Sequence, residues 1–212
     1  MLREKTRIAV LVSGGGTNLQ ALLNAAAAGR MPDGEIVLAA ASRPDAYALE
    51  RARAAGVPAI VIDKKACASQ AEFEAKLLGA LRGAGAELIV LAGFLSILSE
   101  SFTARFPRRI LNIHPSLIPS FCGKGYYGLR VHEAALARGV KLTGATVHFV
   151  NEIPDGGEIV AQRAVAVQPG DTPETLQRRV MEEAEWILLP EAAQEVARAI
   201  RTDADYPAAD YA

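Results

Sequence analysis

The sequence predicts an α/β fold: a mostly parallel, twisted sheet flanked by helices, with an antiparallel pair of strands near the C-terminal end of the sheet. Short apolar strand patterns alternate with helical patterns up to about residue 113, as in parallel strands joined by right-handed crossovers. Residues 87–91 (Glu-Leu-Ile-Val-Leu) form an apolar run typical of a strand buried on both faces. Beyond residue 140, two strand patterns flank the turn sequence Pro-Asp-Gly-Gly, which predicts two adjacent antiparallel strands.

The elements of the first half follow from apolar periodicity and from glycines that end helices. Residues 7–12 (Arg-Ile-Ala-Val-Leu-Val) predict a buried strand, and the Ala/Leu-rich residues 18–28 predict a helix that Gly29 ends. Gly56 ends a second helix in the same way. The remaining elements expected in this half are strands over 35–41, 58–62, 87–91 and 109–113 and helices over 45–55, 69–81 and 99–105.

The pattern changes after Pro115, where a loop rich in Gly and Tyr runs to about Gly128. The run Asp171-Thr172-Pro173-Glu174 supplies a cap, a first-turn proline and a carboxylate, which together predict the start of a long helix that continues to about residue 198. The other elements expected here are a helix over 131–138 and the antiparallel strands over 143–150 and 158–167.

The composition suits one compact domain, expected over residues 1–200, followed by a loose tail over 201–212. With 23 basic and 24 acidic residues, the net charge of −1 gives no field that would attract nucleic acid or an anionic membrane. No apolar run is long enough to span a bilayer, and the start of the chain does not have the apolar region of a signal peptide. Together with only two cysteines in unrelated positions, this predicts a cytoplasmic protein. The three histidines form no clustered ligand set, so no metal site is expected.

The most informative stretch is Leu111-Asn112-Ile113-His114-Pro115. Side chains two residues apart on a strand share a face, so Asn112 and His114 point the same way. Pro115 ends the strand and puts the pair at a strand's carboxyl end, where open α/β sheets place their ligand crevice. An amide donor beside an imidazole suits the stabilisation of an oxyanion and the movement of a proton, although such a histidine can also be purely structural.

A second candidate site is the loop Ser13-Gly14-Gly15-Gly16-Thr17-Asn18, between the first strand and the first helix. Glycines at this position let backbone N–H groups converge on an anion, aided by the helix N-terminus. The loop is neither G-x-G-x-x-G nor a lysine-bearing Walker loop, which favours the phosphate of a small substrate over a dinucleotide or a nucleoside triphosphate. The alternative is a tight turn in which Thr17 simply caps the helix.

Other polar and apolar groups allow two interpretations each. Asp155 lies in an Asp-Gly-Gly turn, where aspartate is ordinary; if the turn folds over the sheet edge, its carboxylate is expected to raise the pKa of His114. The apolar residues 91–98 can be core packing or a slot for a flat heterocycle. His148, within a strand, is expected to be structural, and His132 is expected to open a helix and to be exposed.

Together these motifs resemble the folate-dependent glycinamide ribonucleotide formyltransferases of purine synthesis. The resemblance keeps order and spacing up to about residue 190. It rests on Ser-Gly-Gly-Gly-Thr-Asn-Leu-Gln from residue 13, Leu-Ala-Gly-Phe from 91, Leu-Asn-Ile-His-Pro-Ser-Leu from 111, Gly-Ala-Thr-Val-His-Phe-Val from 144 and Asp-Gly-Gly from 155.

The resemblance implies a Rossmann-like formyltransferase domain whose N-terminal half binds the acceptor and whose C-terminal half binds folate and carries catalysis. It implies a catalytic trio of Asn112, His114 and Asp155, with Thr146 as a supporting hydroxyl near a catalytic water. It implies that the acceptor's phosphate and ribose are held by Gly16, Thr17, Asn18 and Glu185. The folate-binding residues that it implies are Leu95, Ser96, Ile97, Leu98, Asn112, Asn151, Glu152, Ile153, Pro154 and Asp155.

The implied reaction is direct transfer of a formyl group from 10-formyltetrahydrofolate to the amine of N1-(5-phospho-D-ribosyl)glycinamide, through a tetrahedral intermediate and without a metal. The implied partners are these two small molecules, with no nucleic acid or membrane, for a monomer or a homodimer. Two alternatives stay open: a 10-formyltetrahydrofolate hydrolase and a non-catalytic nucleotide-binding module. The chain departs from the family pattern in its longer loop over 121–128, and in Gln70 and Ser96, which stand where some members have arginine.

Overall fold

A computed structural model describes residues 4–203 and 205–211. Residues 1–3 of the predicted domain and residues 204 and 212 of the predicted tail lie outside the described residues. One seven-stranded sheet has the order β3-β2-β1-β4-β5-β6-β7. Neighbours from β3 to β5 pair in parallel, whereas β6 pairs antiparallel with both β5 and β7. The predicted mixed sheet is thereby confirmed. Its strands are β1 (Thr6–Val12), β2 (Gly34–Ala41), β3 (Ala59–Val61), β4 (Leu88–Leu91), β5 (Ile110–His114), β6 (Leu142–Phe149) and β7 (Ile159–Ala166).

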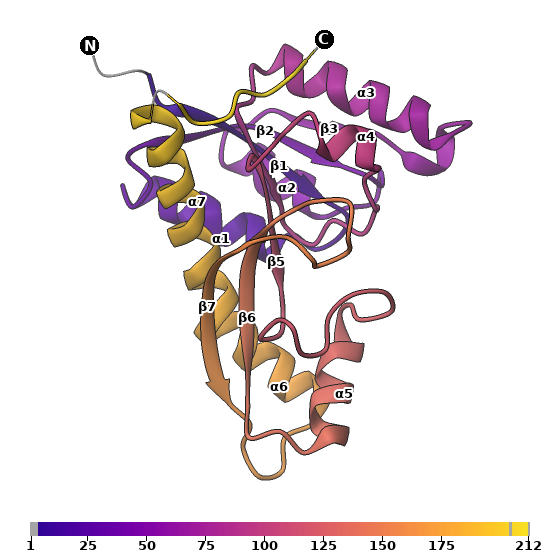
Figure 1. The fold of residues 1–212 in the computed structure, drawn as a ribbon, viewed down its shortest axis with the longest axis vertical. Coiled ribbons are helices and arrows are strands. Elements are labelled where there is room, and N and C mark those ends of the chain that lie inside the picture. The colour runs from indigo at the N-terminus through magenta and orange to yellow at the C-terminus, as the bar shows by residue number, and fades with distance from the viewer. Residues whose placement is uncertain (1–3, 204, 212) are drawn as a thin grey trace.

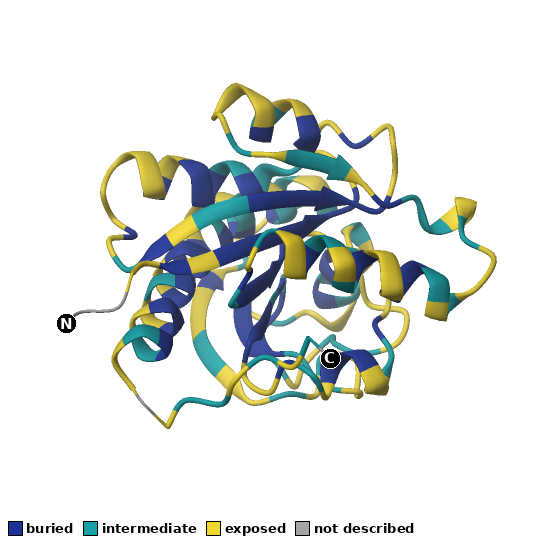
Figure 2. Cartoon of the chain, turned by 90° about the horizontal axis from the view of Figure 1, so that it is seen from above, coloured by how far each residue is buried: buried dark blue, intermediate teal, exposed yellow. Residues whose placement is uncertain are grey.

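Helices cover both faces of the central sheet, so β1, β4 and β5 are largely buried, whereas the edge strand β7 is mostly exposed (Figures 1 and 2). None of the helices in the described part of the chain combines the length and apolarity needed to cross a membrane. The helices are α1 (Thr17–Ala27), α2 (Ala48–Ala54), α3 (Gln70–Gly83), α4 (Glu100–Thr103), α5 (Leu129–Arg138), α6 (Pro173–Val180) and α7 (Trp186–Thr202), with a short 3-10 turn η1 (Lys64–Ala66).

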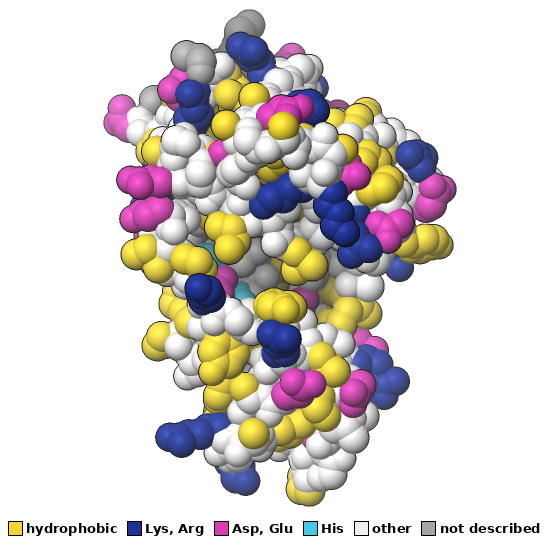
Figure 3. All heavy atoms as spheres, turned by 90° about the vertical axis from the view of Figure 1, so that its right-hand side faces the viewer, with side chains coloured by type: hydrophobic (Ala, Val, Ile, Leu, Met, Phe, Trp, Pro, Cys, Tyr) yellow, Lys and Arg dark blue, Asp and Glu magenta, His cyan; other side chains and the backbone are white. Residues whose placement is uncertain are grey.

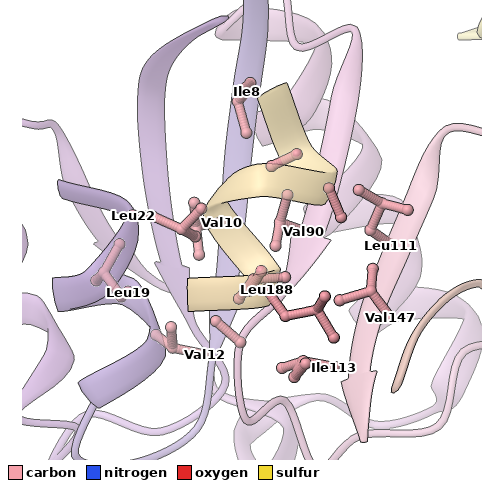
Figure 4. Packing of buried hydrophobic residues seen from close by; sticks show 14 of the residues in the cluster. Ile8, Val10, Val12, Leu19, Leu22, Val90, Leu111, Ile113, Val147 and Leu188 are labelled. Atoms are coloured by element: carbon pink, nitrogen blue, oxygen red, sulfur yellow. The ribbon is translucent and has the colours of Figure 1, made fainter. Parts of the chain in front are cut away.

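Strand alternation divides the core into two apolar clusters. Ile8, Val10 and Val12 of β1 face the cluster built with α1, α2, α5, α6 and α7 (Figure 4). Ala9 and Leu11 face the opposite cluster, built with α3 and α4. Because both faces are covered, the central strands read as continuous apolar runs rather than as alternating ones.

Strand β5 joins the parallel and antiparallel parts of the sheet and sets the position of its polar residues. Leu111 and Ile113 pack in the cluster with α7, so Asn112 and His114 lie on the opposite face. In the antiparallel pairing with β6, Asn112 is opposite His148 and His114 is opposite Thr146. The sequence predicts the β6–β7 pair but gives no register between β5 and β6.

The predicted C-terminal helix is one rod interrupted by a π-helical segment, η2 (Met181–Glu185), between α6 and α7. It begins as expected, since Thr172 and Thr175 form a capping box and Pro173 lies between them in the first turn. Pro190 inside α7 has no N–H to donate to the preceding turn. π-Helical turns occur frequently at functional sites, and this one carries Glu185.

The predicted loose tail is instead packed against the sheet, and in Figure 1 it runs from the end of α7 to the side of α3. The Tyr206 hydroxyl donates to the Arg108 carbonyl at 2.6 Å, and the Asp210 amide donates to the Arg105 carbonyl at 2.8 Å. Tyr211 donates to the Ala86 carbonyl and meets the Phe106 ring edge-on. Aromatic residues near a chain terminus can therefore supply the anchoring that its polar composition does not reveal.

His132 is not exposed, as predicted, but completely buried within α5. Neither ring nitrogen has a hydrogen-bond partner among the described residues. Burial lowers the pKa of His132 from 6.5 to about 4, with a smaller contribution from His114.

This burial predicts acid sensitivity of the fold. The unfolded chain binds a proton at His132 near pH 6.5, whereas the folded chain does not until about pH 4, so stability falls as the pH drops through this window. Linkage gives a loss of ~2 kcal/mol between pH 7 and pH 5 from this residue. Urea unfolding at pH 7 and pH 5 measures this loss. The free energy of unfolding of His132→Leu is expected to fall less between the two pH values than that of the wild type, by about the amount given above. An equal fall in wild type and variant would contradict the assignment.

Candidate active site

The structure brings Asn112, His114 and Asp155 together at the carboxyl end of β5. The His114 Nδ1 and Asp155 Oδ2 atoms are 3.4 Å apart, although the residues belong to different segments. His114 is 4% exposed, and the Asp155 side chain is 14% exposed. The turn after β6 thus folds over the sheet edge and presents a carboxylate to the imidazole.

The pKa of His114 moves in the direction opposite to the one predicted. Burial lowers the pKa of His114 below its ordinary value, and the charge of Asp155 and the Phe121 carbonyl offset this only in part. The sequence-based expectation of a raised pKa is therefore wrong for the protein without substrates, because desolvation outweighs the carboxylate. At neutral pH the ring is mainly neutral and can accept a proton.

Hydrogen bonding decides which nitrogen of His114 accepts that proton. Nε2 lies 2.9 Å from the Phe121 carbonyl oxygen, which can only accept, so Nε2 carries the hydrogen of the neutral ring. Nδ1 is then the basic atom, and it faces Asp155. A proton taken up at Nδ1 is held beside a carboxylate.

Asp155 occupies left-handed backbone, with φ 56°, in the turn after β6. Burial by itself would raise the pKa of this carboxyl. The nearby His148, the charge of His114 and the Gly123 amide together lower that pKa below its ordinary value. Asp155 is therefore an anion at neutral pH.

His148, which the sequence predicts to be structural, lies in the candidate site. Its Nδ1 lies 2.8 Å from the Phe149 carbonyl and carries the ring hydrogen, so Nε2 accepts from Asn112 Nδ2 at 3.1 Å. Nε2 also lies 3.5 Å from Asp155 Oδ1. The hydrogen bond to His148 orients the Asn112 amide, and the amide nitrogen retains a second hydrogen for a bound acceptor. The only available signal was the β5–β6 register, which the sequence does not provide.

The two segments implied to bind folate form the walls of one cleft beside the trio. Figure 3 shows a hollow across this face of the molecule, with histidine and carboxylate atoms visible inside it. Apolar side chains stand exposed at its walls: Leu95 is 65%, Ile97 69% and Ile153 57% exposed. All ten residues implied by the resemblance line it: Leu95, Ser96, Ile97, Leu98, Asn112, Asn151, Glu152, Ile153, Pro154 and Asp155.

The glycine loop ends β1 beside the point where the strand order reverses between β1 and β4. Gly16, with φ 72°, is the N-cap of α1, and no side chain caps this end, so Thr17 is not the cap of a simple turn. A Cβ at Gly16 would lie 2.5 Å from the Cβ of Ala48. The Ala48 amide donates to the Gly14 carbonyl at 3.1 Å, and α2 begins only here, later than the predicted residue 45.

Two polar side chains that sequence reasoning missed hold this loop. Arg51 of α2 donates through Nε to the Gly15 carbonyl at 2.8 Å. Ser13 accepts through Oγ from the Leu95 amide at 2.9 Å, and its own amide donates to the Gly93 carbonyl. Ser13 therefore ties the glycine loop to the wall of the cleft.

Asn18 and Glu185 meet in the interior next to the glycine loop. Asn18 Nδ2 donates to Glu185 Oε2 at 2.6 Å, and both residues are buried. Burial raises the pKa of Glu185, and the bond from Asn18 opposes this. Asn18 Oδ1 has no partner among the described residues. The pair thus offers buried acceptor oxygens beside a helix N-terminus.

Thr146 is buried and acts on the backbone after β5. Its Oγ1 donates to the Ser116 carbonyl at 2.7 Å and accepts from the Ile118 amide at 3.1 Å. Gln162 of β7 contacts the same hydroxyl at 3.0 Å. The hydroxyl therefore anchors the loop that follows His114.

Comparisons with known proteins agree with this geometry. Residues 6–192 match the formyl transferase family model. A chloroplastic phosphoribosylglycinamide formyltransferase of Arabidopsis thaliana is 42% identical over 85% of this chain, and the trifunctional purine biosynthetic protein adenosine-3 of Gallus gallus is 46% identical over 92%. The chain spans 62% of the first relative and 19% of the second.

A solved structure shares both the sequence and the fold. The glycinamide ribonucleotide transformylase 1 of Symbiobacterium toebii superposes with a TM-score of 0.85 at 45% identity, covering 92% of this chain and 89% of its own. The family match extends from β1 into α7 and includes the glycine loop, the trio and both walls of the cleft. The chain belongs to the formyl transferase family.

Proposed function

We propose that this protein transfers a formyl group from 10-formyltetrahydrofolate to the amine of N1-(5-phospho-D-ribosyl)glycinamide, in purine biosynthesis. The convergence of Asn112, His114 and Asp155 at the edge of a cleft is the observation that supports this most directly. A non-catalytic nucleotide-binding module has no use for a buried imidazole–carboxylate pair beside an oriented amide. The names of the similar proteins support the same substrates.

The acceptor binds, in this proposal, at the glycine loop and the start of α1. The uncapped helix N-terminus at Gly16 and Thr17 suits a phosphate. The oxygens of Asn18 and Glu185 suit ribose hydroxyls, because Asn18 Oδ1 is buried and no other described residue bonds to it.

The folate ring system fits the cleft between the segments 95–98 and 151–155. A flat heterocycle needs apolar walls, and Leu95, Ile97 and Ile153 expose apolar surface there. The backbone of both walls offers N–H and C=O groups for its polar edge. Asn112 lines the cleft and can reach a carbonyl bound in it.

The chemistry that the site supports is general acid–base catalysis with an amide donor. As the neutral amine attacks the formyl carbon, the second N–H of Asn112 stabilises the oxyanion, and His114 Nδ1 takes a proton from the attacking nitrogen. The anionic Asp155 stabilises the resulting imidazolium. The same proton then passes to N10 of the folate as the bond from N10 to the formyl carbon breaks.

We further propose that residues 1–200 act as a single formyltransferase domain in the cytoplasm, as a monomer or homodimer on its two small substrates, with Thr146 supporting the site through the loop after β5. One relative of this family is named as chloroplastic. The packed tail is a part of the same body.

One assay separates the proposed transferase from its alternatives. The protein is mixed with 10-formyltetrahydrofolate, with and without N1-(5-phospho-D-ribosyl)glycinamide, and tetrahydrofolate is measured. Loss of the formyl group only with the acceptor supports the proposal. Loss of the formyl group without the acceptor identifies a hydrolase. If the formyl group is lost in neither mixture, the result favours a non-catalytic binding module.

The phosphate assignment predicts a KM effect at Gly15. Its backbone φ is not in the left-handed region and a Cβ would meet nothing within 4 Å, whereas a side chain at Gly16 would push into Ala48. Gly15→Val is therefore expected to fold, while the valine side chain blocks access of the phosphate to the backbone of the glycine loop. The KM for the acceptor is expected to rise about tenfold with little change in kcat. Steady-state kinetics with each substrate varied checks this; an unchanged KM would mean that the loop is only a turn.

A further inference from the structure

The segment Phe121–Gly123, at the start of the loop that is longer than the family pattern, contacts both His114 and Asp155 through its backbone. The Phe121 carbonyl accepts from His114 Nε2 at 2.9 Å. Two residues later, the Gly123 amide donates to Asp155 Oδ2 at 2.8 Å. Oδ2 is the same oxygen that faces His114 Nδ1, so the segment closes a ring of contacts around the pair.

The backbone conformation of this segment is unusual and specific. Phe121 has φ 52°, in the left-handed region that non-glycine residues rarely adopt. Gly123 has φ 85°, in the same half of conformational space. Residues held in such conformations persist where the surrounding structure fixes them, and they cluster at functional sites.

The polypeptide just before this segment is fastened to the sheet. Thr146 of β6 holds the Ser116 carbonyl and the Ile118 amide, and the Ser116 hydroxyl donates to the Ser120 carbonyl at 2.5 Å. The position of the Phe121 carbonyl is therefore tied to the strand that also carries His148.

We propose that Phe121 and Gly123 are positioning residues that set the protonation geometry of the His114–Asp155 pair. The Phe121 carbonyl keeps the hydrogen of the neutral imidazole on Nε2 and leaves Nδ1 as the base. The Gly123 amide holds Asp155 Oδ2 against Nδ1. The catalytic consequence rests on the proposed function, whereas the effect on protonation does not.

Replacement of one peptide bond by an ester tests this with a minimal change. An ester between Cys122 and Gly123 removes the amide hydrogen that Asp155 accepts and adds no side chain. An ester between Lys124 and Gly125 is the matched control, since Gly125 also has positive φ (96°) in the same loop but its amide does not bond to His114 or Asp155. The side-chain carboxyl ¹³C titration of Asp155 and the ring ¹⁵N shifts of His114 are measured without substrates, and kcat is measured with them.

The first ester alone is expected to raise the pKa of Asp155 and to lower kcat about tenfold, through loss of one charge-assisted hydrogen bond. The ¹⁵N shifts of the unmodified protein are expected to report the Nε2–H tautomer of His114. A carboxyl titration that is unchanged, or that moves equally in both esters, overturns the role of Gly123, and an Nδ1–H tautomer overturns that of Phe121. If the unmodified protein transfers no formyl group, the titrations still decide this inference while the proposed function fails.

Discussion

His114→Ala is expected to lower kcat by about 10²–10⁴-fold, the range typical of a lost general acid–base group. The reason is that Nδ1 is the basic atom in the site that lies directly beside an anion able to stabilise its protonated form. The KM values for both substrates are expected to change little, because the walls of the cleft and the glycine loop do not include His114. Steady-state kinetics with each substrate varied measures both parameters.

His114→Gln is the matched control for lost packing. Its amide can still donate to the Phe121 carbonyl, but glutamine does not take up a proton at neutral pH. It is therefore expected to be about as slow as the alanine variant. Turnover near that of the wild type in either variant would show that the proton moves by another route.

The pH profile gives the same residue an independent signature. In the proposed mechanism neutral His114 is the active form. Burial lowers the pKa of His114, so wild-type kcat is expected to persist below pH 6.5 and to fall only as the imidazole becomes protonated. In both His114 variants this acid limb is expected to disappear from the profile of the residual activity.

Asp155→Asn is expected to lower kcat by about 10²-fold or more, again with little change in KM. Asparagine tolerates left-handed backbone and is nearly isosteric, so the turn at φ 56° should persist while the charge is lost. Without the anion, protonation of His114 Nδ1 has no electrostatic support. Asp155→Ala would add backbone strain of about 1–2 kcal/mol and would therefore mix a folding effect with a chemical one.

Glu158→Gln is the control for a lost carboxylate in the same region. Glu158 lies just beyond the turn, is largely exposed and pairs with Arg108 at 2.9 Å, away from the imidazole. The kcat of Glu158→Gln is expected to equal that of the wild type. Equal kcat for Asp155→Asn and Glu158→Gln would mean that the Asp155 carboxylate has no part in the reaction.

Much of this protein was determined by its sequence alone. Uninterrupted apolar strands alternating with helices predict the parallel sheet, and the alternation along β5 correctly puts Asn112 and His114 on one face. Thr172 and Pro173 predict the start of the long helix. These features depend on backbone preference and on neighbours within a few residues, which a sequence displays directly.

Only the tertiary structure decided how the site works. The contact between Asn112 and His148 spans 36 residues and follows from a strand register that neither segment encodes by itself. His132 is polar and lies near a helix start, yet packing buries it. The pKa of His114 is the balance between desolvation and one nearby charge, and its sign follows only when both are known. Local sequence patterns place the candidate site residues on their elements. Long-range packing sets the contacts and the charge of these residues.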